Sequence, residues 1–306
     1  MMQRTHERGT PVAQLIDAVK KYDGTPVVNG VSLEIPAGQT TMLVGPNGSG
    51  KTTSMEMLIG LREMSDGRAE IMGQAVQPGG PHRLVTGVQL QQSGLPSRLR
   101  VNEALAAVAS LYREPEDIRQ LADSLGLSKH WRTSVDKLSG GLRRRLDIAI
   151  ACVGSPHFLL LDEPTSGIDP EGRAELWEFL RVRARSGCAI LASTHDLEEA
   201  EAFADRLYVM ASGRIALHGQ PEEVLAAAGG QFRLRINDAS SQLTQAIQAS
   251  GLVHGKVGIT TLAVGGADEI DALRDRLQQL EPGLEVRFGR IRLEDVFAVT
   301  MWRDAA

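Results

Sequence analysis

Short apolar runs alternate with longer stretches of helical periodicity along the first two thirds of the chain. TTMLV at 40–44, FLLLD at 158–162 and CAILAS at 188–193 each have the length of a fully buried strand. The segment EGRAELWEFLRVRA lies between the last two runs and has apolar positions at helical spacing. Because buried strands that alternate with helices form parallel sheets, this order predicts an α/β fold with a mostly parallel sheet.

A block of helical pattern interrupts the strands in the middle of the chain. It runs from about residue 96 to 154 and contains VNEALAAVASLY, EDIRQLADSL and GGLRRRLDIAIACV. Residues 13–44, by contrast, are expected to form several strands, of which TTMLV is the last. We therefore expect a helical subdomain at about residues 92–154, inserted between elements of the sheet.

A different pattern follows PEEVLAAAGGQ, which reads as a helix ended by a Gly-Gly break at 229–230. The segments FRLRI, SSQLTQAIQAS, GKVGITTLAV, DEIDALRDRLQQL and LEVRF then predict the order strand–helix–strand–strand–helix–strand. A closing helix is expected near LEDVFAV. Residues 231–306 are thus expected to form a small C-terminal α+β domain.

Composition narrows the possible classes of function. The net charge of −5 and the pI near 5.9 argue against a general nucleic-acid binder. The two cysteines, Cys152 and Cys188, lie singly in apolar stretches, so no disulfide framework is expected and a reducing cytoplasm is the simplest location. The N-terminus MMQRTHERGT has no apolar secretory region, and no apolar run approaches the ~18–20 residues that span a bilayer. A membrane role would therefore depend on a partner.

The segment GPNGSGKT at 45–52 matches the phosphate-loop pattern G-x-x-x-x-G-K-[ST]. It follows a predicted strand and precedes a predicted helix, so a simple glycine-rich turn is a poor alternative. Backbone amides of this loop would surround nucleotide phosphates, Lys51 would neutralise the γ-phosphate, and the Thr52 hydroxyl would ligate Mg²⁺. The expected nucleotide-binding residues here are Gly45, Pro46, Asn47, Gly48, Ser49, Gly50, Lys51, Thr52 and Thr53.

Acidic and histidine side chains follow two of the buried strands. Asp162 ends FLLLD and is expected to anchor Mg²⁺, and Glu163 is expected to polarise the attacking water. His195 follows CAILAS, where it would reach the γ-phosphate. Taken alone, the acidic pair could be a strand-to-turn junction and the histidine a structural residue. The phosphate loop makes both of those alternatives weaker.

Two further candidates rest on less specific patterns. Gln91, in GVQLQQSGL, is expected to ligate Mg²⁺ and to report its presence to a mobile segment. Gln92 is the alternative, and either residue could be a solvated loop residue. Tyr22, in KYDG, is a candidate to stack on adenine, with strand packing as the equal alternative.

A second predicted anion site lies in LSGGLRRRL at 138–146. Ser139 and the amides of Gly140 and Gly141 open a helix and resemble a terminus that holds an anion. A chain with one phosphate loop does not need this site for its own nucleotide. The run Arg143–Arg145 reads equally well as a solvated helix face or as a set of residues with a direct role.

The motifs GPNGSGKTT, Gln91, LSGGLRRRL, FLLLDEP, SGID and STHD follow the order and spacing of an ABC-transporter ATP-binding subunit. The resemblance covers about residues 12–228 and implies an ABC ATP-binding domain there. This domain would be a P-loop NTPase core with a β-subdomain and an inserted helical subdomain. The resemblance also implies that Ser139, Gly140 and Gly141 cap the γ-phosphate bound to a second subunit, and that Asp169 of SGID lies in the loop crossing between the two.

The branch of the family is indicated by two short stretches. Leu142 replaces the glutamine of the common LSGGQ form, and the arginines that follow it resemble the ABC-2, daunorubicin-resistance-like exporters. IRLEDVFAVT at 291–300 is similar to the end of those subunits. The C-terminal domain at 231–306 would then be regulatory or brace the dimer, with simple packing on the core as the alternative.

The resemblance implies a transport motor that binds and hydrolyses ATP with Mg²⁺, with Glu163, His195 and Lys51 as catalytic residues. Two subunits, expected as a homodimer with a heterodimer left open, would close on two ATP and drive a separate transmembrane permease. The subunit would be cytoplasmic and peripheral on the inner face of the cell membrane, with no nucleic-acid partner. The alternatives are a soluble ABC ATPase acting on ribosomes or DNA, and a module that binds ATP without driving transport.

Overall fold

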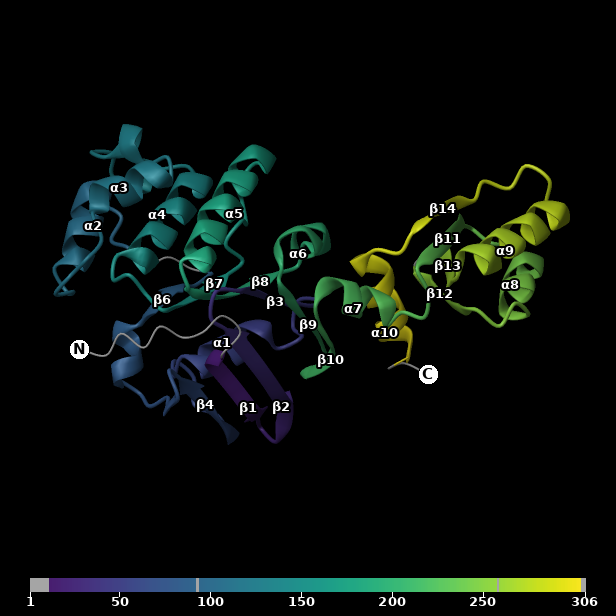
Figure 1. Cartoon of the computed structure of the whole chain (residues 1–306), viewed down its shortest axis with the longest axis horizontal. Coiled ribbons are helices and arrows are strands. Elements are labelled where there is room, and N and C mark those ends of the chain that lie inside the picture. Colours follow the sequence, from purple (N-terminus) through teal and green to yellow (C-terminus); the bar gives the residue numbers. More distant parts are fainter. Residues whose placement is uncertain (1–10, 92–93, 258, 304–306) are drawn as a thin grey trace. The chain divides into compact units, whose positions relative to one another are not determined.

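The computed structural model describes residues 11–91, 94–257 and 259–303. The chain divides into two compact units, Met1–Ile215 and Ala216–Ala306. The division falls within the last strand of the central sheet, earlier in the chain than the expected domain end at residue 228. The expected domain limits of 12–228 and 231–306 therefore stay predictions, and each unit is described separately (Figure 1).

A six-stranded sheet forms the centre of the first unit, with the order β10-β9-β3-β8-β7-β6. Its β3, β6, β7, β8 and β9 pair in parallel. All residues of β3, β7 and β8 are buried, as the apolar runs predicted, because helices and a second sheet cover the two faces. The strands are β3 (Thr40–Val44), β6 (Thr86–Gln89), β7 (Phe158–Asp162), β8 (Ala189–Thr194), β9 (Arg206–Ala211) and β10 (Arg214–Gly219).

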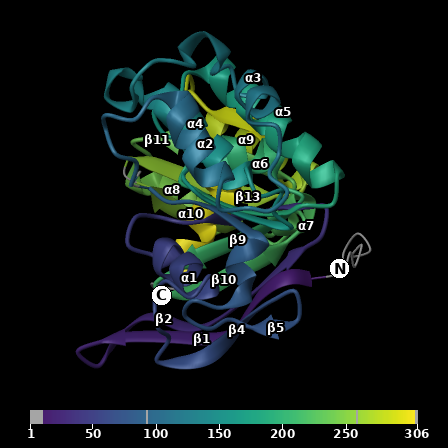
Figure 2. The same ribbon diagram turned by 90° about the vertical axis from the view of Figure 1, so that its left-hand side faces the viewer.

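The second sheet of this unit is antiparallel and has the order β2-β1-β4-β5. Its strands, β1 (Pro11–Tyr22), β2 (Thr25–Pro36), β4 (Asp66–Ile71) and β5 (Gln74–Ala75), lie together as one layer in Figure 2. Leu15 and Leu33 on its inner face belong to the same apolar core as Phe158 and Leu191 of the central sheet. Helix α1 (Lys51–Leu58) contributes Met55 and Met57 to that core.

The helical block forms as expected and packs against the edge of the central sheet. Glycine at position 87 permits this packing, because a Cβ there would lie 2.0 Å from the Ala151 carbonyl oxygen of α4. Residue 92, where the helical subdomain was expected to begin, lies outside the described residues. The helices of the first unit after α1 are η1 (Pro81–Leu84), α2 (Val101–Ala109), α3 (Ile118–Ser124), η2 (Ser128–His130), η3 (Val135–Lys137), α4 (Gly140–Cys152), α5 (Pro170–Arg185) and α6 (Leu197–Phe203).

The second unit has the expected order of strands and helices, preceded by α7 (Pro221–Ala226). Its antiparallel sheet has the order β12-β13-β11-β14, and α8 and α9 cover one face through Leu234, Ile247 and Leu277. This β-α-β-β-α-β arrangement is a common α+β architecture. The elements are β11 (Phe232–Asn237), α8 (Ser241–Gln248), β12 (Val253–Val257), β13 (Thr260–Gly265), α9 (Ala267–Leu280), β14 (Arg287–Arg290) and α10 (Leu293–Arg303).

Helix α10 is fastened to β11 by a buried carboxylate. Asp295 is 0% exposed, and its two oxygens accept hydrogen bonds from Arg233 Nη1 at 2.6 Å and Arg235 Nη2 at 2.6 Å. The backbone amide of Arg292 also donates to Asp295 Oδ2 at 2.8 Å. Because side chains alternate along a strand, both arginines lie on the face opposite Leu234. The LEDVF stretch therefore marks a helix that covers the second face of this sheet.

Both cysteines are free and buried, in agreement with the expected lack of a disulfide framework. Burial raises the pKa of the Cys152 thiol to about 12, and it also raises the pKa of Cys188. Among the residues that the structure describes, no helix has the length and apolarity needed to cross a membrane.

Candidate functional site

The loop 45–50 joins β3 to α1 and surrounds the ammonium group of Lys51. Gly48 and Gly50 have φ angles of 80° and 104°, which favour glycine, and Gly50 is the N-cap residue of α1. Lys51 Nζ donates to the carbonyl oxygens of Gly45 at 2.7 Å and Pro46 at 3.1 Å. Burial lowers the pKa of Lys51, while the carboxylates of Glu163 and Asp162 act in the opposite direction. The arrangement suits a bound anion, since a helix N-terminus and a buried cation meet at one loop.

The carboxylate of Asp162 lies beside the first turn of α1. Thr52 Oγ1 donates to Asp162 Oδ2 at 3.0 Å, and Ser193 Oγ donates to Asp162 Oδ1. A hydroxyl and a carboxylate oxygen at this distance are ligands of the kind that Mg²⁺ prefers. The side chains of Thr52 and Asp162 thus fit a magnesium site next to the phosphate loop.

Glu163 and His195 meet at the ends of β7 and β8. His195 Nδ1 lies 3.1 Å from Glu163 Oε1, and the side chains are 62% and 15% exposed for His195 and Glu163 respectively. Glu163 has a φ of 51°, and its backbone amide donates to Ser193 Oγ at 3.0 Å. Residues held in the left-handed region occur often at active sites. A carboxylate oriented by a neighbouring imidazole can accept a proton from water.

A cavity of about 360 Å³ joins these groups. It is lined by Val27, Asn47, Gly48, Gly50, Lys51, Thr52, Thr53, Gln91, Glu163 and His195. Most predicted residues of the phosphate loop therefore lie together with the predicted water-activating pair and with Gln91. Gln92, the alternative to Gln91, lies outside the described residues.

Tyr22 is not among the residues that line this cavity. Its ring is half exposed at the end of β1, with Lys20 Nζ 5.3 Å and Arg62 Cζ 5.9 Å from the ring centroid. Arg62 also donates a hydrogen bond to the Tyr22 hydroxyl. Val27, which lines the cavity, was not singled out from the sequence. Adenine stacking by Tyr22 stays a prediction.

The second predicted anion site does form a helix N-terminus. Ser139 is the N-cap of α4, and its Oγ accepts from the backbone amide of Leu142 at 3.3 Å. Ser139 and Gly140 are exposed, and neither they nor Gly141 line the cavity beside the phosphate loop. A Cβ on Gly141 would lie 3.5 Å from the Gly167 carbonyl oxygen, so this terminus adjoins the SGID loop.

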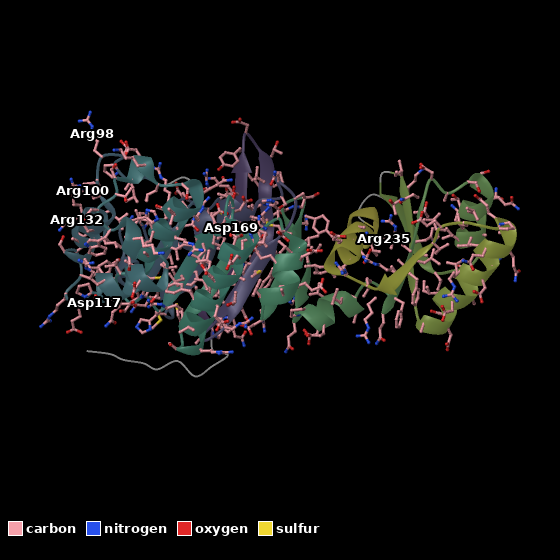
Figure 3. The ribbon with its side chains drawn as sticks, turned by 90° about the horizontal axis from the view of Figure 1, so that it is seen from above. Arg98, Arg100, Asp117, Arg132, Asp169 and Arg235 are labelled. Carbon is pink, nitrogen blue, oxygen red and sulfur yellow. The ribbon has the colours of Figure 1, made fainter. Side chains whose placement is uncertain are left out.

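Asp169 ends that loop as the N-cap of α5 (Figure 3). Its Oδ1 accepts from the Gly172 amide at 2.9 Å, and this hydrogen bond is the main reason that the pKa of Asp169 is lowered. The carboxylate is therefore committed to capping α5 while it lies on the exposed surface next to α4.

Two polar residues of this region were missed from the sequence. Ser193 contacts both Asp162 and Glu163. Glu199 is a buried carboxylate that accepts hydrogen bonds from α5, from β8 and from the turn after β7. Its donors are Thr165 Oγ1 at 3.0 Å, Trp177 Nε1 at 2.7 Å and Thr194 Oγ1 at 2.9 Å. The signal for Glu199 was its position three residues after Asp196, the N-cap of α6, which is the spacing of a capping box.

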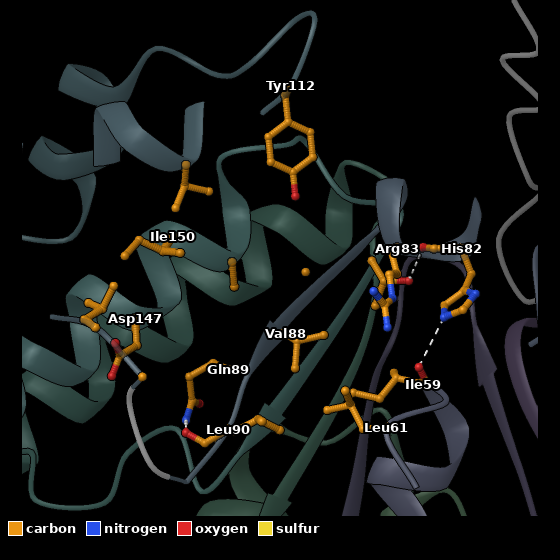
Figure 4. A pocket seen from close by; sticks show the side chains of 16 residues that line it. Ile59, Leu61, His82, Arg83, Val88, Gln89, Leu90, Tyr112, Asp147 and Ile150 are labelled. Atoms are coloured by element: carbon orange, nitrogen blue, oxygen red, sulfur yellow. Dashed lines mark hydrogen bonds between the residues drawn. The ribbon is translucent and has the colours of Figure 1, made fainter. Parts of the chain in front are cut away.

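A larger cavity, of about 550 Å³, lies between α1, β6, α2 and α4 (Figure 4). It is lined by apolar side chains and a few polar ones, among them His82, whose Nε2 donates to the Ile59 carbonyl oxygen at 3.1 Å. Leu61 lines this cavity and is 54% exposed. Leu84 and Leu111, 66% and 75% exposed, are chain neighbours of the lining residues Arg83 and Tyr112. Three exposed leucines thus lie in the cavity lining or next to it in the sequence.

Comparison with known proteins agrees with this geometry. The family model described as "ABC transporter" matches residues 28–166, and a second one, for an AAA domain, matches residues 132–201. The daunorubicin/doxorubicin resistance ATP-binding protein DrrA of Streptomyces peucetius is 33% identical over 298 residues, which cover 91% of this chain and 89% of that protein. The Nod factor export ATP-binding protein I of Ralstonia nicotianae is 37% identical over 71% of this chain and 69% of its own.

A solved structure described as the ATP-binding subunit of an ABC transporter has a TM-score of 0.65 and 26% identity. The match covers 71% of this chain and 92% of that structure. The likeness therefore extends over most of that ATP-binding subunit, and the matching family model at 28–166 spans the phosphate loop and the helical block. The chain belongs to the ATP-binding proteins of ABC transporters, a family of P-loop ATPases, and its relatives include subunits named for drug resistance and export.

Proposed function

We propose that this chain is the motor subunit of an exporter, in which two copies close on two ATP and drive a separate membrane permease. One observation supports dimer closure above all: the first unit has two helix N-termini fitted for phosphate, at Lys51 and Ser139. Only the terminus at Lys51 lines the cavity with Glu163 and His195. The exposed terminus at Ser139 is then free to cap the nucleotide of a second copy.

The residues of the cavity have separate roles in the proposed reaction. Lys51 would exchange the carbonyl oxygens of Gly45 and Pro46 for the γ-phosphate. The negative charge of that phosphate would offset the cost of desolvating the ammonium group, which lowers the pKa of Lys51. Thr52, Asp162 and Gln91 would hold Mg²⁺, which would supply charge that neutralises the phosphates. The phosphate-loop amides hold the remaining phosphate oxygens.

Water activation is assigned to Glu163. Its carboxylate orients the attacking water and accepts its proton, while His195, 3.1 Å away, fixes the carboxylate and lies within reach of the γ-phosphate. Asp169 holds the N-terminus of α5 next to the cap at Ser139, at the surface that the second copy would meet.

The larger cavity is assigned to the permease. Its lining includes the exposed Leu61, and also Gln89 and Leu90, which directly precede Gln91. Leu84 and Leu111 are exposed chain neighbours of the lining residues Arg83 and Tyr112. An apolar segment of a permease that fits this hollow would contact α4 and the strand leading to the metal-binding loop. This subunit would then be cytoplasmic and lie on the inner face of the membrane through its permease.

Export is proposed from the relatives, which are named for drug resistance and for Nod factor export. The match to the drug-resistance protein covers 91% of this chain and therefore extends into the second unit. That shared second unit supports the exporter branch. We propose that residues 231–306 brace the dimer.

The test uses Glu163→Gln, which keeps the shape of the side chain and removes its basicity. Turnover should fall by about 10²–10⁴ while ATP binding is retained. Light scattering should then show a monomer without nucleotide and a dimer with Mg-ATP, because hydrolysis no longer reopens the pair.

The matched control adds Ser139→Arg to Glu163→Gln. This exposed residue does not line the phosphate-loop cavity, so ATP should still bind, but the cap is blocked and no dimer should form. If the Glu163→Gln protein binds ATP and stays monomeric, self-pairing is contradicted and a different partner subunit is indicated. Unchanged turnover would contradict the role of Glu163.

A further inference from the structure

The arginines that follow the cap at Ser139 are not equivalent, although they are consecutive in α4. Arg145 Nη2 donates to the Gly172 carbonyl oxygen at 3.4 Å and forms an ion pair with Glu175 at 2.8 Å, both on α5. Arg144 Nη1 instead contacts the loop after β6, where it donates to the carbonyl oxygens of Leu90 at 3.1 Å and Gln91 at 3.3 Å. The Nε of Arg143 is buried without a hydrogen-bond partner among the described atoms.

The loop that Arg144 contacts is also tied to the metal carboxylate. Gln89, buried at the end of β6, donates from Nε2 to the Asp162 carbonyl oxygen at 3.1 Å and to the Leu90 carbonyl oxygen at 2.6 Å. The Leu90 carbonyl oxygen thus accepts from both Gln89 and Arg144. A continuous series of hydrogen bonds runs from the strand end at Asp162 through this loop to α4.

This series joins two places that face different nucleotides in the proposed dimer. The loop at Gln91 lines the cavity of the chain's own phosphate loop, whereas the N-terminus of α4 belongs to the exposed cap. Hydrogen bonds from a charged donor are stronger than neutral ones, and two successive carbonyl oxygens fix the backbone of the loop in position and orientation. A shift of the loop when Gln91 engages the metal would therefore move Arg144 and its helix.

We propose that Arg144 is a positioning residue that couples the loop at Gln91 to α4, so that occupation of one nucleotide site orients the cap for the other. This inference rests on the proposed dimer, but the coupling it describes lies within a single copy. Coupling between sites of this kind changes an equilibrium constant by about tenfold. Arg144 does not line the phosphate-loop cavity, so its loss is expected to leave the ATP affinity of the monomer within about twofold.

The first experiment is hydrogen exchange on monomeric Glu163→Gln protein, kept too dilute to dimerise. Mg-ATP should slow amide exchange in two segments, residues 86–91 and residues 140–146. Adding Arg144→Met should preserve the slowing at 86–91 and abolish it at 140–146. Arg143→Met is the matched control on the same helix, and should leave both responses as in the parent protein.

The second experiment measures dimer formation by light scattering in the same variants. Arg144→Met should raise the protein concentration for half-maximal dimerisation about tenfold, with Arg144→Lys intermediate. Combining Arg144→Met with Gln91→Ala should cause no further loss, because both changes interrupt one connection. An equal melting temperature for Arg144→Met and Arg143→Met excludes a general loss of stability.

The two proposals fail in different ways. If the Glu163→Gln parent binds ATP without dimerising, the proposed dimer is contradicted, while the exchange experiment still tests Arg144. If Arg144→Met keeps the slowed exchange at 140–146, or if its effect adds fully to that of Gln91→Ala, the coupling role is overturned.

Discussion

A single hydroxyl group, that of Ser193, contacts both acidic residues at the end of β7, Asp162 and Glu163. Ser193 Oγ donates to Asp162 and accepts from the backbone amide of Glu163, whose φ is 51°. One buried side chain therefore fixes the metal-binding carboxylate and also the backbone of the residue assigned to activate water. The sequence offers little sign of this role, because a serine inside an apolar strand usually only fills space.

Ser193→Ala should lower kcat about tenfold or more, with the KM for ATP within about twofold. The substitution leaves the Glu163 amide without its hydroxyl acceptor, and an unsatisfied buried donor costs about 1–3 kcal/mol. Steady-state kinetics separates the two parameters. Ser54→Ala removes another buried hydroxyl, next to the Met210 sulfur, and should leave kcat unchanged. Equal effects of the two variants would show that Ser193 has only a packing role.

At the scale of elements, the carboxylate of Asp295 on α10 binds Arg233 and Arg235 on β11 and so holds the helix against the strand. The carboxylate is fully buried, while the side chains of Arg233 and Arg235 are 17% and 30% exposed. Breaking a buried ion pair on one side leaves charge without compensation, whereas an exposed pair contributes little. The closing helix is thus held by a few specific bonds as well as by its apolar residues Leu293, Val296 and Val299.

Asp295→Ala should destabilise the second unit by about 3–5 kcal/mol. Hydrogen exchange of β11 amides in the full chain measures this loss directly. Glu294→Ala removes the neighbouring carboxylate, which is 48% exposed and lies 3.1 Å from Arg235 Nη2. That control should cost less than about 1 kcal/mol. A cost for Asp295→Ala as small as that of the control would mean that apolar packing alone holds α10.

At the scale of the whole molecule, the phosphate-loop cavity and the larger cavity are lined by different residues, and the larger one is proposed to receive the permease. Leu84 is strongly exposed next to that hollow, so a charge there is not expected to disturb folding. A charged side chain at position 84 would oppose burial in an interface, because burying an unpaired charge is costly. The two surfaces can therefore be tested independently.

Leu84→Glu should leave the ATPase rate of the isolated protein within about twofold. Its stimulation by membranes that contain the permease should fall about tenfold or more, because the apolar contact is lost. The ATPase assay with and without such membranes provides the measurement. Val182→Glu, at an exposed apolar position on α5, is the control and should retain stimulation. Full stimulation of the Leu84→Glu protein would argue against this docking surface.

Much of the fold was predictable because buried parallel strands and a complete phosphate loop leave strong local patterns. The β-α-β-β-α-β order of the second unit was also predictable, since its apolar positions change period at each element. Contacts between distant segments were not predictable from the sequence, and the roles proposed for Arg144 and Ser193 rest on such contacts. The pairing of Asp295 with two arginines of β11 was not predictable for the same reason, because about sixty residues separate the partners. Tyr22 contacts Arg62 and does not line the phosphate-loop cavity, so its role in adenine stacking stays a prediction.

The burial of both thiols has a practical consequence for labelling this protein. Burial raises the pKa of the Cys152 thiol, so little of it is present at neutral pH as the thiolate, which is the form that alkylating reagents attack. Cys188 is protected in the same way. A cysteine introduced on an exposed surface would therefore be the reactive one in the folded chain. The natural protein can serve directly as a background for site-specific fluorophores or spin labels.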